Sequence, residues 1–220
     1  MTTHIGMLLY PGLTQLDLTG PFEVLHRIPD AKVHLVWKTT GIVMADSGLG
    51  LLADTSFAEC PPLDVLFVPG GVGQMALMSD EVVLAFLRAQ GARARWVTSV
   101  CTGALVLGVA GLLGGYEATT HWAYQELLPS FGATPVRKRV VVDRNRVTGG
   151  GVTAGIDFAL RLAAEMAGED LARAIQLGLE YDPEPPFRSG HPDVADAALV
   201  ARVRAALAES VERRQAALSP

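Results

Sequence analysis

The stretch Arg95-Trp-Val-Thr-Ser-Val-Cys-Thr-Gly-Ala104 decides the fold of this chain. Its residues 96–100 are apolar and rich in β-branched side chains, which predicts a buried strand. Residues 102–113 predict a helix that begins at once and leaves no room for a loop. Cys101 is therefore expected on a sharp strand-to-helix turn, at the positive end of a helix dipole, where the thiolate is favoured. The nucleophile of G-x-S-x-G enzymes is presented in the same way, whereas a buried cysteine that only packs is the alternative.

Strand and helix patterns alternate on both sides of this stretch. Strands are expected at 4–10, 32–39, 63–68, 137–142 and 146–148, with short strand or hairpin material at 48–55. Helices are expected up to about residue 28 and at 80–90, 122–128, 153–167, 169–181 and 192–218. The alternation predicts a mostly parallel sheet with helices on both faces, a three-layer α/β/α sandwich. We expect residues 1–220 to form a single domain, in which 182–220 supply a Pro-rich connector and a final helix.

Composition and charge exclude several classes of protein. Half of the 220 residues are hydrophobic, 19% are charged and the net charge is −5, which is typical of a globular protein and gives no electrostatic basis for binding nucleic acid. No stretch approaches the roughly 20 apolar residues of a membrane span, and residues 4–10 are too short for a signal peptide. Two cysteines make no disulfide framework. The expected location is the reducing cytoplasm.

Three predicted strands end in turns that carry reactive groups. The turns are Leu9-Tyr-Pro-Gly-Leu-Thr-Gln-Leu-Asp17, Phe67-Val-Pro-Gly-Gly-Val-Gly73 and Val100-Cys-Thr-Gly103. Ligands of an open parallel sheet bind beyond the carboxyl ends of its strands, so we expect the three turns to meet at one site. Gly70 and Gly71 can point backbone N–H groups into a cavity, as in an oxyanion hole. A Gly-Gly pair is also common in ordinary turns.

Asp17 is the expected partner of Cys101. A carboxyl beside a thiolate does not easily ionise as well, so the two groups are expected to share a proton and to titrate as a pair. Such a pair can deliver a proton to whatever the sulfur attacks. The alternative is that Asp17 only caps a helix through Thr14. The sequence leaves open whether that helix starts early or has Pro21 in its first turn.

His121 is the candidate for a Cys–His pair, but a structural role at a helix start is favoured because nothing local places it beside Cys101. No group of His, Cys, Asp and Glu has the spacing of a metal site, so no metal is predicted. The run Gly149-Gly-Gly-Val-Thr-Ala-Gly155 lacks the lysine of a phosphate-binding loop and the spacing of a dinucleotide-binding loop. It predicts tight packing near the cysteine turn and no cofactor.

Together these motifs resemble the ThiJ/PfpI superfamily, which shares its fold with the class I glutamine amidotransferases. The resemblance extends from Ile5 to about Leu179 and implies a flavodoxin-like fold. Most members carry Glu at the position of Asp17, and many carry His at the position of Thr102. The segments that carry the resemblance are Pro11-Gly12, Asp17, Gly20-Pro-Phe-Glu-Val24, Pro69-Gly-Gly71, Ser99-Val-Cys-Thr-Gly103, Gly111-Leu-Leu113, Ala118-Thr-Thr-His-Trp122 and Gly151-Val-Thr-Ala-Gly-Ile-Asp157.

The combination at positions 17, 101 and 102 resembles the members that act on isocyanides. It implies a homodimeric, cofactor-free lyase that adds water to a small-molecule isocyanide, R–N≡C, and releases an N-substituted formamide. Cys101 would attack the isocyanide carbon to give a thioimidate, and Asp17 would act first as acid and then as base. Thr102 would hydrogen-bond Asp17 or the water, and its N–H would join the two glycine amides. The expected catalytic residues are Cys101, Asp17 and Thr102, and the expected substrate-binding residues are Gly70, Gly71 and Ile156.

Three alternatives remain at this stage. The same motifs resemble the ligand-sensing half of AraC-type transcription regulators, so a non-catalytic ligand sensor or a redox sensor is possible. A sensor does not need a proton-sharing nucleophile. A glyoxalase of the superfamily is expected to carry Glu in place of Asp17, and an amidase needs His121 to reach Cys101. The isocyanide lyase is the favoured interpretation.

Overall fold

The computed structural model of the chain describes residues 2–216 and is built around one seven-stranded sheet. Its strands are β1 (Thr3–Leu8), β2 (Ala31–Trp37), β5 (Thr55–Ser56), β6 (Val65–Val68), β7 (Trp96–Val100), β10 (Val140–Asp143) and β11 (Arg146–Gly149). Their order is β10-β11-β7-β6-β1-β2-β5, and only β10 runs antiparallel to its neighbour. The run β2-β1-β6-β7-β11 is the flavodoxin-like order.

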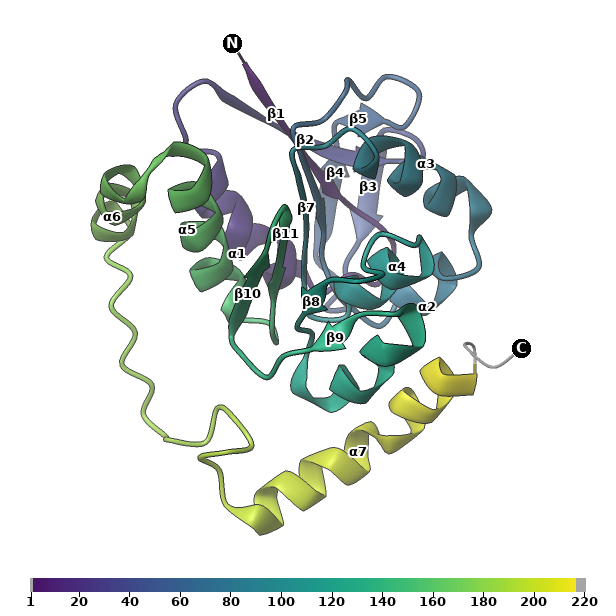
Figure 1. Cartoon of the computed structure of the whole chain (residues 1–220), viewed down its shortest axis with the longest axis vertical. Coiled ribbons are helices and arrows are strands. Elements are labelled where there is room, and N and C mark those ends of the chain that lie inside the picture. The colour runs from purple at the N-terminus through teal and green to yellow at the C-terminus, as the bar shows by residue number, and fades with distance from the viewer. Residues whose placement is uncertain (1, 217–220) are drawn as a thin grey trace.

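Helices cover both faces of the sheet and confirm the three-layer α/β/α sandwich (Figure 1). One face carries α1 (Gln15–Leu25), α5 (Ala154–Ala167) and α6 (Glu169–Gly178), with α5 packed between the other two. The other face carries α2 (Gln74–Leu77), α3 (Glu81–Gly91), α4 (Gly103–Val109) and the 3-10 helix η1 (Trp122–Phe131). A last helix, α7 (Ala197–Ala216), lies across the outside of η1. No helix within 2–216 is long and apolar enough to cross a bilayer.

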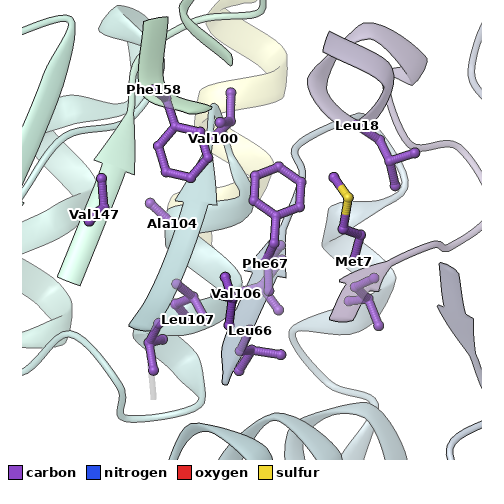
Figure 2. Packing of buried hydrophobic residues seen from close by; sticks show 14 of the residues in the cluster. Met7, Leu18, Leu66, Phe67, Val100, Ala104, Val106, Leu107, Val147 and Phe158 are labelled. Carbon is purple, nitrogen blue, oxygen red and sulfur yellow. The ribbon is translucent and has the colours of Figure 1, made fainter. Parts of the chain in front are cut away.

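The core lies on both sides of the central strands β6 and β7, whose residues are all buried. Figure 2 shows Phe67 of β6 beside Phe158 of α5, with their ring centres 5.6 Å apart. Ala104 and Leu107 of α4 lie behind the sheet in the same view and are fully buried. Strands that are buried on both faces are held rigidly, so their carboxyl ends form a fixed platform for side chains.

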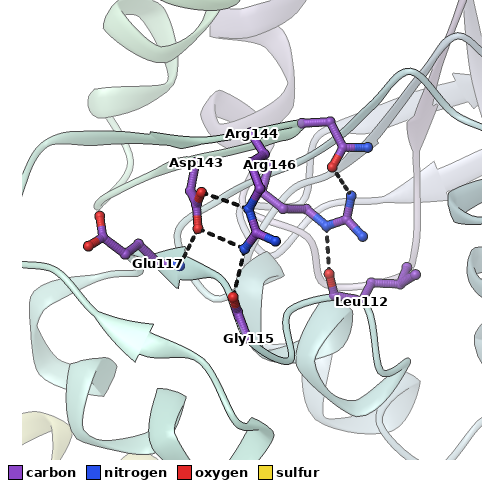
Figure 3. Close-up of polar contacts among 7 residues, drawn as sticks. Leu112, Gly115, Glu117, Asp143, Arg144 and Arg146 are labelled. Atoms are coloured by element: carbon purple, nitrogen blue, oxygen red, sulfur yellow. Dashed lines mark hydrogen bonds and ion pairs between the residues drawn. The ribbon is translucent and has the colours of Figure 1, made fainter.

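A polar network surrounds the turn that joins β10 to β11 (Figure 3). Arg144 pairs with Asp143 and donates to the carbonyl oxygen of Gly115, at 2.6 Å. Arg146 donates from Nε to the carbonyl oxygen of Leu112, also at 2.6 Å. Both guanidinium groups lie over the ring of Tyr116. β11 pairs in parallel with β7, and the carbonyl oxygens of Gly149 and Gly150 at its end accept from the Cys101 N–H.

Several expected elements differ in extent or kind. The helix expected at 102–113 ends at Val109, because Gly111 takes a left-handed conformation at φ +77°. The helix expected at 122–128 is the longer 3-10 helix η1. The hairpin material at 48–55 is a separate ribbon of β3 (Gly41–Met44) and β4 (Gly50–Ala53), and a small pair of β8 (Glu117–Ala118) and β9 (Thr134–Pro135) was not predicted.

The final helix differs most from expectation. It starts at Ala197, and the expected residues 217 and 218 lie outside the described part of the chain. The apolar side chains that recur along it, such as Val203, remain partly exposed. Its one buried residue is Arg214. The residue that α7 buries most completely is therefore a cation, although Val211 also packs against the core.

Candidate active site

The cysteine turn has the geometry that its sequence predicts. Cys101 takes a left-handed conformation at φ +55°, which is strained for a residue with a side chain. Its N–H donates to the carbonyl oxygens of Gly149 at 3.1 Å and Gly150 at 2.8 Å, and its own carbonyl oxygen accepts from the Thr120 hydroxyl at 2.7 Å. A Cβ at Gly103 would overlap the carbonyl oxygen of Val68. Helix α4 thus begins directly against the end of β6, and the turn is held from both sides.

Asp17 lies in the first turn of α1 and is fully buried. Its Oδ2 accepts from the N–H of Gly70 at 2.9 Å, and its Oδ1 is buried without a hydrogen-bond partner among the described residues. The Cys101 side chain lies close by, beside the same Gly70. The capping alternative is wrong, because the Thr14 side chain makes no cap bond and donates to Asp46 instead. The helix does start early, at Gln15, so Pro21 lies inside it.

The three turns meet at Gly70. A Cβ built on Gly70 would lie 2.6 Å from the Thr102 nitrogen, 2.7 Å from Asp17 Oδ2 and 2.8 Å from the Cys101 Cβ. Only glycine allows the three residues to approach so closely. The strand order turns back between β1 and β6, so the site occupies the position at which open α/β sheets bind ligands.

The glycine amides are not free donors, which corrects one expectation. The N–H of Gly70 is engaged by Asp17, and the N–H of Gly71 donates to the Thr102 hydroxyl at 3.1 Å. Both amides therefore hold catalytic candidates in place instead of pointing unpaired into a cavity. The physical reason is that a buried N–H rarely stays without an acceptor when a carboxyl or hydroxyl is within reach.

Burial controls the charge of the pair. It raises the pKa of Asp17 to about 7, against a hydrogen bond from Gly70 that favours the carboxylate. Burial, together with the negative charge of Asp17, also raises the pKa of Cys101 well above its usual range, although hydrogen bonding from Thr102 acts in the opposite direction. The expectation that this turn favours the thiolate is therefore wrong, because desolvation by burial is the larger effect and raises the pKa of Cys101. The pair retains one proton around neutral pH, as expected for coupled acids.

Ile156 packs against α1, one turn beyond Asp17. It lies in the first turn of α5, and its Cγ1 would be 3.2 Å from a Cβ on Gly20, one turn of α1 beyond Asp17. The glycine-rich run before it packs tightly, as predicted: a Cβ on Gly155 would come within 3.0 Å of the Pro21 ring. The side chain of Ile156 is only partly buried.

A cavity of about 440 Å³ adjoins the cysteine turn. It is bounded by residues 119–123, 137–139, 150–154 and 190–193 and by Arg204. Thr120 and Gly150, which bond to the Cys101 backbone, line it, but the side chains of Cys101 and Asp17 do not. The cavity thus borders the residues that hold the cysteine turn and not the two reactive side chains.

His121 has the structural role that was favoured. Its Nδ1 accepts from the N–H of Ala123 at 3.3 Å and caps η1, and no hydrogen bond joins it to Cys101 in the described part of the chain. Burial and the nearby charge of Arg214 lower the pKa of His121 to about 4. It is therefore neutral at physiological pH and is not placed to activate the cysteine.

Sequence reasoning missed three buried polar residues around the site. Tyr10, at the end of β1, donates its hydroxyl to the carbonyl oxygen of Pro69 at 2.9 Å, and its pKa is raised by burial and by the charges of Asp17 and Cys101. Gln74 in α2 accepts from Arg214 of α7 at 2.8 Å. The Pro11-Gly12 turn that follows Tyr10 is a signal from which Tyr10 could have been predicted as a residue of the site. Nothing in the sequence distinguishes Arg214 from the other arginines of its helix.

The fold and the site define a flavodoxin-like α/β protein with a cysteine on a strained turn and a buried carboxyl beside it. The DJ-1/PfpI family matches residues 3–165, and the chain belongs to this family. The chain is 58% identical to isonitrile hydratase from Pseudomonas putida over 97% of this chain and 94% of that protein. It is 33% identical to the HTH-type transcriptional regulator GbdR of Pseudomonas aeruginosa, over 81% of this chain but 50% of the regulator.

Solved structures agree with this assignment. A THiJ/PfpI family protein from Pseudomonas syringae superposes with a TM-score of 0.97 at 44% identity, over all of this chain and 92% of that one. Drosophila melanogaster DJ-1beta superposes with a TM-score of 0.72 at 26% identity, over 82% of this chain and 98% of that one. The resemblance inferred from the motifs is thereby confirmed.

Proposed function

We propose that this protein is an isonitrile hydratase, a lyase that adds water to an isocyanide to give an N-substituted formamide. The observation that carries the proposal is the 58% identity, over nearly the full length of both chains, to the isonitrile hydratase of Pseudomonas putida. The close approach of Asp17 and Cys101 around Gly70 supports it, because the reaction requires a nucleophile and a proton donor together. A sensor role is supported by a weaker match to half of a regulator.

The first step of the proposed mechanism forms a carbon–sulfur bond. In the one-proton form of the pair, Asp17 takes the thiol proton, and the Cys101 sulfur attacks the terminal carbon of R–N≡C. Asp17 then returns that proton to the carbanionic carbon, which gives the thioimidate R–N=CH–S–Cys101. Isocyanide and thiol are thus joined with no atom lost.

The second step uses Asp17 in the opposite sense. Its carboxylate removes a proton from a water molecule that adds to the thioimidate carbon, and the tetrahedral adduct collapses with loss of the Cys101 thiolate. The nitrogen and the thiolate take up the two protons of the water, so R–NH–CHO leaves and the thiol is restored. Thr102 orients Asp17 or the water, Gly70 holds Asp17, Gly71 holds Thr102 and Ile156 lines the substrate pocket.

We also propose the domain organisation, the location and the oligomeric state of the protein. We infer one domain over residues 1–220, a cytoplasmic location and a homodimer. A ribbon outside the main sheet supports the homodimer: the outward side of β3–β4 carries Ile42, 74% exposed, and Leu52, 61% exposed, as a cross-strand pair. Met44 and Leu49 extend this apolar face, half exposed. The solvated side of a ribbon is usually polar, so an apolar one indicates a covering partner.

The test is the loss of an aliphatic isocyanide, followed by the infrared N≡C band, with formamide measured as product. Wild type should turn over, Cys101→Ala should lose the reaction, and Asp17→Asn should be slower by roughly 10²–10⁴-fold, as for removal of a general acid–base group. Cys60→Ala is the matched control, since Cys60 lies far along the chain beside Pro61 and Pro62. A folded wild type without turnover would contradict the function, and an active Cys101→Ala would contradict the covalent route.

A further inference from the structure

Arg214 is a buried cation whose position the mechanism above does not explain. It is 3% exposed, although most of α7 is exposed. Its Nε donates to Oε1 of Gln74 at 2.8 Å, its Nη1 donates to the carbonyl oxygen of Ser210 at 3.0 Å and to the hydroxyl of the same residue, and its guanidinium lies 4.7 Å from the ring centre of Tyr124. A charge is taken out of water at a cost of several kcal/mol unless an opposite charge compensates it.

No carboxylate within residues 2–216 lies at ion-pair distance from Arg214. The titratable groups that face it are Tyr124 on η1, Tyr10 at the end of β1, Cys101 at the end of β7, His121 before η1 and its exposed neighbour Arg213. Two of these are phenols, one is a neutral imidazole and one is a cation. Cys101 is a neutral thiol near neutral pH, but it becomes the opposite charge beside Arg214 when its proton moves to Asp17.

Gln74 connects Arg214 to the loop that builds the site. It is fully buried in the first turn of α2, and its N–H donates to the carbonyl oxygen of Gly71 at 3.3 Å. The N–H of the same Gly71 donates to the Thr102 hydroxyl. A chain of hydrogen bonds therefore links the guanidinium to the residue beside Cys101, and Arg214 is fixed relative to the sulfur.

We propose that Arg214 is a positioning residue of the active site: the final helix carries its guanidinium to the cysteine turn, where its charge stabilises the thiolate form of the Cys101–Asp17 pair. In the proposed mechanism this lowers the cost of moving the thiol proton to Asp17 before attack. Only the effect on turnover rests on the proposed function, because the charge state of Cys101 can be measured without a substrate.

Arg214 comes from a part of the chain that the family match does not cover. The family match ends at residue 165, whereas Arg214 lies in the last described turn of α7. The match to the Pseudomonas putida hydratase covers 97% of this chain, and the Pseudomonas syringae structure covers all of it. In this chain the cation thus comes from a segment outside the part that matches the family.

The test is the pH profile of Cys101 alkylation by iodoacetamide, in a Cys60→Ala background so that one thiol reacts. Arg214→Met removes the charge at similar length and should move the midpoint of the profile up by about one pH unit, with alkylation about tenfold slower below the midpoint. Arg214→Lys keeps the charge but loses the planar fork, and its profile should lie between the two. Arg213→Met, at the exposed neighbouring position, should match wild type.

Thermal unfolding of each variant separates the electrostatic effect from a packing defect. If Arg214→Met does not fold, Arg214→Gln, which can still hydrogen-bond Gln74 or Ser210, replaces it in the same profile. A neutral, folded variant with the wild-type profile would overturn the inference. If wild type hydrates isocyanides but the alkylation profile of Arg214→Met is not shifted, only the role of Arg214 is refuted. If the profile is shifted but wild type does not hydrate isocyanides, only the proposed function is refuted.

Discussion

At the residue scale, one proton held between two buried acids defines the chemistry of the site. Desolvation raises the pKa of Asp17 and of Cys101, and the charge of Asp17 raises the pKa of Cys101 further. The pair therefore keeps at least one proton at neutral pH, and it reaches the form with one proton and one negative charge as the pH rises through about 7. A site of this kind can deliver a nucleophile and a proton to the same small molecule without a cofactor.

Holding Asp17 in this position costs stability, and Asp17→Asn should reveal that cost. The folded pKa of about 7 lies above the ordinary value of 3.8, so the stabilising contribution of protonated Asp17 is fully present below about pH 4 and is lost as the pH rises through 7. Asparagine does not titrate and can still accept from Gly70. Urea unfolding should find the variant more stable than wild type by roughly 2–4 kcal/mol at pH 8 and nearly equal at pH 4. The exposed Asp182→Asn serves as control, and a difference that does not depend on pH would contradict the prediction.

At this scale, the sequence predicted the features that short motifs encode. Cys101 was predicted because it follows a strand with a recognisable pattern, and the family resemblance selected Asp17 as its partner. The acceptor of the Gly70 amide was not, because it lies 53 positions away in the chain and no local pattern encodes that bond. Arg214 was missed for the same reason: its acceptor Gln74 is 140 positions away.

At the element scale, the junction of β7 and α4 determines where the sulfur lies. All five residues of β7 are buried and were predicted with the observed bounds, since a continuous β-branched run allows few other structures. The end of α4 was predicted four residues too late, because the apolar pattern continues through Gly111 although the backbone turns there. Close contact between the start of α4 and the end of β6 leaves the turn no freedom.

Gly103→Ala should damage this junction more than its small size implies. The added methyl would overlap the carbonyl oxygen of Val68, a backbone atom in a buried strand that cannot move aside. We expect a loss of stability of about 1–3 kcal/mol or more, as for overpacking in a core, together with a displaced Cys101 and much slower alkylation. Urea unfolding and iodoacetamide reactivity measure the two effects. Gly178→Ala at the end of α6, with no atom near its added methyl, should be neutral or stabilising, and equal behaviour of the two variants would refute the argument.

At the scale of the whole molecule, alternation along the chain predicted the three-layer architecture, and the strand order placed the predicted residues together. Alternation does not specify how segments outside the layers pack. The ribbon β3–β4 and the helix α7 both lie outside the main sheet, and the sequence indicated neither the apolar outward side of the first nor the buried cation of the second. Each of these segments contacts a turn or loop of the site: the N–H of Gly12 donates to the carbonyl oxygen of Met44 at 2.9 Å, and Arg214 donates to Gln74.

The proposed homodimer is the last prediction, and the ribbon is where it can be tested. A two-fold axis lets one apolar patch cover the same patch on a second copy, so Ile42 and Leu52 can be buried without any other partner. Ile42→Glu with Leu52→Glu would place four carboxylates in that interface and should convert a dimer into a monomer in sedimentation velocity. Leu177→Glu changes an 83% exposed side chain on α6 and should leave the mass unchanged. Because the ribbon contacts the first site turn through Met44 and Gly12, the monomer should also hydrate isocyanides more slowly than the control. A double variant that stays dimeric would remove the ribbon from the interface, and a monomeric wild type would refute the homodimer itself.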